Sequence, residues 1–450
     1  MSIIRTIGTG MAWGTVGNIA SKVVGFGNIF LVLSHLTVYE YGLTELTMSV
    51  VAVVGLILFP GLASIITADL GVERARKEYG KMKSLFVEFF TFSMLAGVIA
   101  WAVLFFGSSL VAHLTGNDLI DRFFKIVAFF FLTMPLRAVS SMLATVFVRY
   151  VDQSLFAVVE EMAKGLWLVI FFFIFDRGAD GLLYASVLSQ VVLILVFAPR
   201  TLSAIREFWS AKFEPVPFWK LLREHRKWGV ASTYVGVVGN SVRTWIIKAV
   251  LGTEAVGLYA FAVGILGHLG GLLPIGSVLA PLVPRYVDKR DELIRLLRVS
   301  IKVQVTAAVF YVLAGFFAFP FLILMLFPKY ESMIPILIVF LFSLIPQSVL
   351  SVIMPVFTAL KEQRTQLQSS LFKNVVSFVV MPLFLTFFGI MGTAIEAVFV
   401  LSISTIERYI RLRHLVPEFS FHIRDFIRFD PLERKIIAQV LRRVGLRGQM

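Results

Sequence analysis

The chain has 450 residues, of which 58% are hydrophobic and only 16% are charged, and its mean hydropathy is +0.86. An ordinary soluble domain is about 25% charged, so this composition excludes a water-soluble fold of this size. The absence of cysteine excludes disulfides, thiolate metal sites and thiol nucleophiles. The net charge of +14 would suit nucleic acid, but its distribution along the chain favours a membrane instead.

Long stretches without Asp, Glu, Lys or Arg predict membrane-spanning helices, because about 20 apolar residues cross the hydrocarbon core. Such stretches occupy 46–68, 89–117, 181–199, 255–284, 303–328, 332–360 and 374–395. Spans that carry a few charges are predicted at 8–34, 124–148, 154–175 and 228–250, and the last span at 392–412. The expected fold class is therefore all-α, a polytopic membrane protein with about twelve transmembrane helices.

The positions of Lys and Arg predict the orientation, because cytoplasmic loops are enriched in these residues. With the N-terminus inside, the inner segments contain 33 of the 42 Lys and Arg residues, whereas the outer connections contain four. Both termini are thus expected in the cytoplasm and the protein in the cell membrane. The positive charge is explained by this rule and by contact with anionic lipids, without nucleic acid.

The two halves of the chain resemble each other. A shift of 215 residues places Trp13-Gly14 on Trp228-Gly229 and Gly42-Leu43 on Gly257-Leu258. Two six-span lobes of equal orientation follow, related by an axis along the membrane normal. The predicted organisation is an N-terminal lobe over 1–198, a basic cytoplasmic linker over 199–227, a C-terminal lobe over 228–414 and a basic amphipathic cytoplasmic tail over 415–450.

The tail contains a helix-start pattern. Asp430 is suited to the N-cap, Pro431 to the first turn and Glu433 to the third helical position. Apolar residues then recur on one face and basic residues on the other. This pattern predicts a helix lying on the inner membrane surface, in contact with anionic lipids; a helix that binds a regulatory partner is the alternative.

Two phrases of the sequence resemble a known family. The stretch "WGVASTYVGVVGNSVRTWIIKAVLGTEAVGLYAFA" contains a Leu-Gly-x-x-x-x-Gly-Leu-Tyr pattern, and "WGTVGNIASKVVGFGNIFLVLSHLTVYEYGL" is its looser counterpart in the first half. Both are similar to polysaccharide-biosynthesis (O-antigen-type) flippases of the multidrug/oligosaccharidyl-lipid/polysaccharide exporter superfamily. The resemblance implies two six-helix lobes around a central cleft that is open alternately to either side, but it does not identify the cargo.

Charged residues at membrane depth are costly, so each is a candidate site. Lys22 shares one helical face with Asn18 and Asn28, and the 215-residue shift places Arg243 on Asn28. Since the resemblance places spans one and seven at the cleft, Lys22 and Arg243 are expected to face each other and bind an anionic cargo. Neither face carries an acid, so Arg243 is expected to be unpaired. Helix packing, with the cations paired to acids from elsewhere, is the alternative.

Other polar residues of these spans complete the candidate set. Asn240 shares the face of Arg243, and Lys248 is either a further contact or a side chain that reaches the outer interface. His268 is expected to be a packed histidine, and Asp69 and Glu396 are expected to meet solvent near span ends. The predicted substrate-binding residues are Lys22, Arg243, Asn18, Asn28, Asn240 and Lys248.

A second charged group lies on spans four and five. Glu160 and Lys164 are four residues apart and are expected to pair. Arg137 and Glu161 lie at similar depth. The group is either a structural network or a proton- or ion-coupling site, so Arg137, Glu160, Glu161 and Lys164 are coupling candidates.

The deep cations outnumber the deep acids, which suits an anionic cargo such as a pyrophosphate-linked lipid. The sequence therefore favours a flippase for a lipid-linked (polyprenyl-pyrophosphate) oligosaccharide, used in cell-surface polysaccharide synthesis; polysaccharide-assembly proteins are further candidate partners. A cation-coupled multidrug exporter of the same superfamily and a non-transporting membrane scaffold remain alternatives. No phosphate-binding loop or hydrolase motif occurs, so neither an enzyme nor a cofactor nor a metal is expected.

Overall fold

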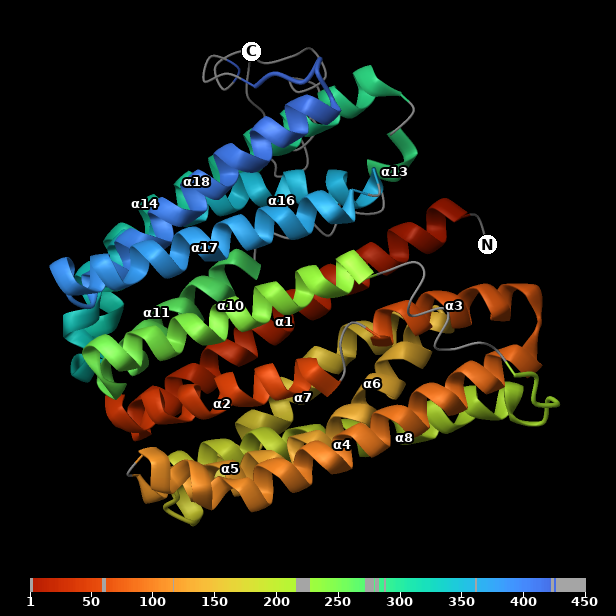
Figure 1. Cartoon of the computed structure of the whole chain (residues 1–450), viewed down its shortest axis with the longest axis horizontal. Coiled ribbons are helices and arrows are strands. Elements are labelled where there is room, and N and C mark those ends of the chain that lie inside the picture. The colour runs from red at the N-terminus through yellow and green to blue at the C-terminus, as the bar shows by residue number, and fades with distance from the viewer. Residues whose placement is uncertain are drawn as a thin grey trace, which may run out of the picture.

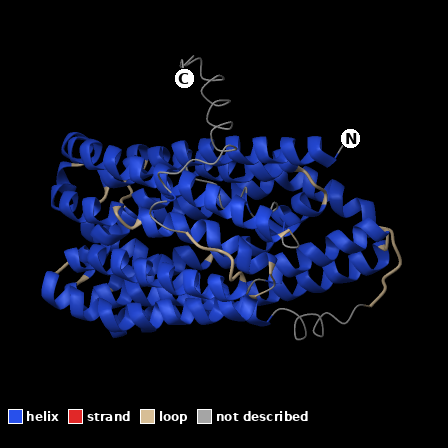
Figure 2. Ribbon diagram, turned by 90° about the horizontal axis from the view of Figure 1, so that it is seen from above, coloured by secondary structure: helices blue, strands red, loops and turns tan. Residues whose placement is uncertain are grey.

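The computed structural model of the chain describes residues 3–58, 62–115, 117–215, 227–271, 289–360 and 362–421, together with 279, 283–286 and 425. The described residues form helices and turns, with no strand among them (Figure 2). The predicted tail helix at Asp430 and most of the amphipathic part of the linker lie outside these ranges.

The first half of the chain makes six helical passages. The second passage contains two described helices, and Pro135 lies inside the fourth. The helices are α1 (Ile3–His35), α2 (Val38–Leu58), α3 (Leu62–Arg76), α4 (Tyr79–Thr115), α5 (Asp118–Ala128), α6 (Phe130–Val146), α7 (Tyr150–Val169) with the π-helical turn η1 (Ile170–Ile174), and α8 (Ala179–Trp209).

The second half repeats this sequence of passages. Its helices are α10 (Lys227–Leu251), α11 (Thr253–Gly271), α13 (Val283–Tyr286), α14 (Arg290–Leu326), the 3-10 helix η2 (Pro328–Met333), α15 (Ile334–Leu341), α16 (Leu344–Ala359), α17 (Gln363–Phe388) and α18 (Met391–Leu415). In Figure 1, α3 to α8 form one group and α14 to α18 another, with α1, α2, α10 and α11 between them.

The outside of the bundle is strongly apolar. Phe106, Phe317 and Phe387 are 70%, 76% and 76% exposed, as lipid-facing side chains would be. By length and apolarity, seven of the described helices could each cross a membrane, or eight passages if the bent pair from Pro328 to Ala359 is one span. The remaining passages carry more polar residues, which the bundle interior accommodates.

The hydrophobic core divides toward one end of the bundle. At the end away from the N-terminus, which the charge pattern predicts to be outside, one cluster joins both halves through Leu33 and Leu36 of α1 and Phe261 of α11. At the opposite, inner end there are two separate clusters, one around Met82 and Phe208 and the other built from α14, α16 and the segment after α18. The lobes are therefore joined at the end that is predicted to be outside, and they have independent cores at the end that is predicted to be inside.

Candidate functional site

The second lobe contains a polar cavity of about 730 Å³, within the range of small-molecule sites. Helices α10, α11, α15, α16, α17 and α18 line it, and Tyr41 and Glu45 of α2 close one side. Its polar side chains are Asn240, Arg243, Thr244, Tyr259, Ser343, Gln347 and Lys373. Two predicted residues, Asn240 and Arg243, thus lie together at one cavity.

Arg243 is held by an acid, and the expectation that it is unpaired is wrong. Its Nη2 lies 2.6 Å from both Oε1 and Oε2 of Glu396 on α18, and the Ser377 hydroxyl donates to Oε1 at 2.6 Å. Glu396 is only 1% exposed, so its predicted contact with solvent is also wrong. The partner comes from another helix, 153 residues along the chain, which the polar stripe of a single helix cannot reveal.

Lys373 of α17 is a cavity cation that the sequence reasoning missed. The apolar stretch at 374–395 that predicted this span begins one residue after Lys373. The helix begins ten residues earlier, at Gln363, and this places Lys373 roughly 15 Å along the helix at 1.5 Å per residue. Within the described ranges, no carboxylate lies within salt-bridge distance of its ammonium group, in contrast to Arg243.

Lys22 lies at a different cavity, so it does not face Arg243 as expected. This second space, of about 390 Å³, is mostly apolar and is lined by α1, α11 and α14. His268 lines it beside Lys22. The reason for the separation is α11, which passes between the two spaces and contributes residues to both.

A third cavity, also of about 730 Å³, belongs mainly to the first lobe, and Arg137 lines it. Arg137 pairs with Glu160 at 2.7 Å, so the expected pairing of Glu160 with Lys164 is wrong. Lys164 interacts electrostatically with Glu45 of α2. Glu45 directly precedes the apolar stretch 46–68 that predicted the second span. The four predicted coupling candidates therefore separate into different contacts.

Asn28 and Arg243, which the repeat places in equivalent positions, each bind a carboxylate. Asn28 Nδ2 donates to Glu161 Oε2 and to the Glu161 carbonyl oxygen, both at 2.8 Å. Asn28 is buried against α7 and lines none of the three cavities above. One carboxylate is thus held by a neutral amide and the other by a guanidinium.

The two remaining predicted residues have local contacts. Lys248 lies over the ring of Trp245, 4.7 Å from its centroid. Asn18 is half-buried on α1, and its carbonyl accepts a hydrogen bond of 3.0 Å from the Ser21 hydroxyl. In the described part of the chain, no three His, Asp or Glu side chains gather where they could hold a metal ion.

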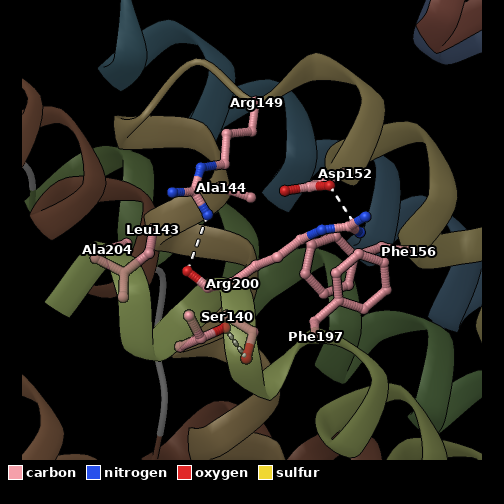
Figure 3. Close-up of a pocket in the computed structure, with 10 residues that line it drawn as sticks. Ser140, Leu143, Ala144, Arg149, Asp152, Phe156, Phe197, Arg200 and Ala204 are labelled. Carbon is pink, nitrogen blue, oxygen red and sulfur yellow. Dashed lines mark hydrogen bonds and ion pairs between the residues drawn. The ribbon is translucent and has the colours of Figure 1, made fainter. Parts of the chain in front are cut away.

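Some inner-end cations have a structural role. Figure 3 shows Arg200 of α8 paired with Asp152 of α7 at 3.0 Å, while Arg149 donates to the Arg200 carbonyl oxygen at 2.8 Å. The space between them is only about 10 Å³, at the limit for one water molecule. These residues therefore clamp α7 to α8 and leave no room for a cargo.

The sequence model of one family, described as polysaccharide biosynthesis protein, matches residues 7–287. The chain belongs to this family. The match includes α1 to α8 and the first helices of the second half, with Lys22, Asn28, Glu161, Arg243 and His268. The resemblance noted from the two Gly-Leu phrases is thereby confirmed. Among curated proteins, no sequence matches the chain.

Solved structures similar to this member of the polysaccharide biosynthesis protein family are transporters. An inward-facing multidrug resistance MATE family transporter of the MOP superfamily has a TM-score of 0.73 and 15% identity, with 90% of this chain and 95% of that chain covered. A MOP superfamily transporter from Pyrococcus furiosus Vc1 (DSM3638), noted for a reversed polarity of its binding pocket, has a TM-score of 0.68 and 14% identity over 92% and 96%. The expected two-lobed, all-α transporter fold is confirmed; at these identities the likeness concerns the fold alone.

Proposed function

We propose that the protein is a flippase that moves a lipid-linked, polyprenyl-pyrophosphate oligosaccharide across the cytoplasmic membrane for cell-surface polysaccharide synthesis. Membership of the polysaccharide biosynthesis protein family supports the cargo class, and the transporter fold supports movement across a membrane. A sugar headgroup cannot cross hydrocarbon, whereas a prenyl tail is stable within it. A polar cavity inside an apolar bundle serves both parts of such a molecule.

The observation that carries the proposal is the position of Lys373. Its ammonium group lines the second-lobe cavity without an acid at salt-bridge distance in the described structure, while Arg243 beside it is bound by Glu396. Lys373 is half-buried, and a cation at membrane depth without a fixed partner favours an anionic occupant or water. The hydroxyls and amides of Thr244, Asn240 and Gln347 lie at the same cavity and can form hydrogen bonds to sugar hydroxyls.

The arrangement of the core supports alternating access. The lobes share one core at the outer end and have separate cores at the inner end. Trp245 of α10 donates to Ser49 of α2 at 3.0 Å, and Lys329 donates to the Ser34 carbonyl oxygen at 3.4 Å, so these lobe-to-lobe hydrogen bonds add to the outer contact. We assign this arrangement to the state that loads its cargo from the cytoplasmic side, with both termini in the cytoplasm.

Translocation of the headgroup of a lipid-linked sugar in reconstituted vesicles tests the proposal. Lys373→Gln removes the charge and keeps a hydrogen-bonding side chain. Since a hydrogen bond to a charged group contributes about 1.5–3 kcal/mol, translocation should fall by roughly tenfold or more. Lys373→Arg should retain part of the activity, because the charge remains. Lys289→Gln is the matched control, since it makes the same chemical change at an exposed inner-surface position.

Two results would reject the proposal. One is a normal rate for Lys373→Gln with unchanged thermal stability. The other is a wild-type protein that leaves lipid-linked sugars in place but exports organic cations, which would identify a multidrug exporter of the same superfamily.

A further inference from the structure

His268 occupies a contact between the two lobes that the proposed cargo cavity does not use. It lies on α11 of the second half, a helix that contacts α1 of the first. If Gly25 of α1 had a Cβ, that atom would stand 2.8 Å from His268 Cε1 and 3.5 Å from the Glu161 carboxylate. The imidazole and the carboxylate therefore meet beside one glycine of α1, where a larger residue would displace the imidazole.

The imidazole is half-buried, and its Nδ1 is buried without a hydrogen-bond partner among the described residues. Packed helices present charged groups to it: Lys22 comes from α1, and Glu161 and Lys164 come from α7. Tyr311 of α14 lines the same cavity. From α2, Glu45 interacts with Lys164.

These surroundings oppose a further positive charge in the described state. The two ammonium groups named above would repel an imidazolium, and the carboxylate among these neighbours, Glu161, is already bound by Asn28. The register of the repeat places Val53 where His268 stands, so the equivalent position in the first half cannot titrate. The histidine is thus a feature of this one contact and is not required by the two-lobed architecture.

We propose that His268 is a proton-binding residue that couples the arrangement of the lobes to pH. When α11 separates from α1 and α7, water reaches the imidazole and one proton binds to a ring nitrogen. That proton must return to water before the described contact forms again. Binding of the proton and formation of the contact therefore exclude each other at His268. Mutual exclusion of this kind couples transport to a proton gradient. The link to cargo movement rests on the proposed function, but the competition itself does not.

The test measures the distance between the lobes in the absence of cargo, so its result is independent of the cargo assignment. The chain contains no cysteine, and Arg76→Cys with Asp291→Cys therefore gives two unique labelling sites at exposed inner positions, one on each lobe. Spin labels at these sites report the inner-end separation in purified protein between pH 8 and pH 5. Acidification should increase the population with the shorter separation, by about tenfold for each unit by which the pKa of His268 differs between the two states.

Variants locate the effect at His268. In the labelled background, His268→Gln should abolish the pH dependence, and Lys22→Gln should reduce its size because one repelling charge is removed. Gly25→Ala should displace the ring and alter the response, whereas Gly27→Ala should not, because nothing lies within 4 Å of a Cβ there. A separation that does not vary with pH, or one that varies equally in His268→Gln, overturns the inference. Thermal unfolding of each variant shows that the compared proteins are folded.

Discussion

Gly42 of α2 and Gly257 of α11 lie against each other where the two lobes meet, although they are equivalent positions of the two halves of the chain. A Cβ on Gly42 would overlap the carbonyl oxygen of Thr253 and stand 2.8 Å from the backbone nitrogen of Gly257. A Cβ on Gly257 would in turn overlap the carbonyl oxygen of Val38. This reciprocal contact places the pseudo-twofold axis between the two glycines, and both belong to the Gly-Leu phrases that mark the family in the sequence.

Alanine at either glycine should destabilise the protein, because its methyl group would meet backbone atoms that cannot rotate away. We expect Gly42→Ala or Gly257→Ala to cost about 1–3 kcal/mol and to lower the thermal unfolding temperature in detergent. Gly267→Ala on the same helix α11 is the control, since nothing lies within 4 Å of a Cβ there; it should be neutral or slightly stabilising. Equal unfolding temperatures for Gly42→Ala and Gly267→Ala would contradict the close contact.

The sequence predicted the all-α architecture well because apolar length and the Gly-Leu repeat are local patterns. It predicted the edges of the helices poorly, since charges were taken as boundaries. Helix α2 begins at Val38 and carries Glu45 into the bundle, and α4 begins at Tyr79, ten residues before the predicted span. A charged side chain inside a bundle needs only one partner or a cavity, and tertiary packing determines which partner it finds.

The candidate site shows the same division. The repeat places Asn28 and Arg243 in equivalent positions, and in the structure both bind carboxylates. The identities of those carboxylates, Glu161 and Glu396, depend on how α7 and α18 pack, which no spacing within α1 or α10 reveals. The separation of Lys22 from Arg243 likewise depends on the path of α11 between them.

Arg243→Ala should destabilise the protein strongly. The substitution leaves the carboxylate of Glu396 buried without its cation, and removal of one partner of a buried ion pair costs about 3–5 kcal/mol. The double variant Arg243→Met with Glu396→Gln should recover much of that loss, because the glutamine carries no charge and still accepts from Ser377. Thermal or denaturant unfolding of Arg243→Met, of Glu396→Gln and of the double variant measures the coupling. Additive losses would show that the pair contributes nothing as a pair.

Glu161→Gln should leave stability nearly unchanged, within about 1 kcal/mol. The glutamine carbonyl can still accept from Asn28, whose amide also donates to the backbone carbonyl of residue 161. Asn28→Ala should cost more, about 1–2 kcal/mol, because it leaves that carbonyl and the carboxylate without their donor. The reverse order of unfolding temperatures would mean that the charge of Glu161 stabilises the fold through one of the neighbouring lysines.

The predicted orientation can be tested by labelling, since the chain contains no cysteine of its own. Single variants Asp118→Cys and Glu254→Cys place a thiol at exposed positions at the outer ends of α5 and α11, and Arg76→Cys and Asp291→Cys place one at the inner ends of α3 and α14. In intact cells a membrane-impermeant maleimide should label the first two only, because inner segments carry 33 of the 42 Lys and Arg residues and such segments stay in the cytoplasm. All four should be labelled after permeabilisation, which controls for burial of the thiol. Labelling of Arg76→Cys and Asp291→Cys in intact cells would show that the orientation is reversed. Lys373 would then lie nearer the outer leaflet. A flippase that collects its cargo from the cytoplasm does not need its first anion contact there.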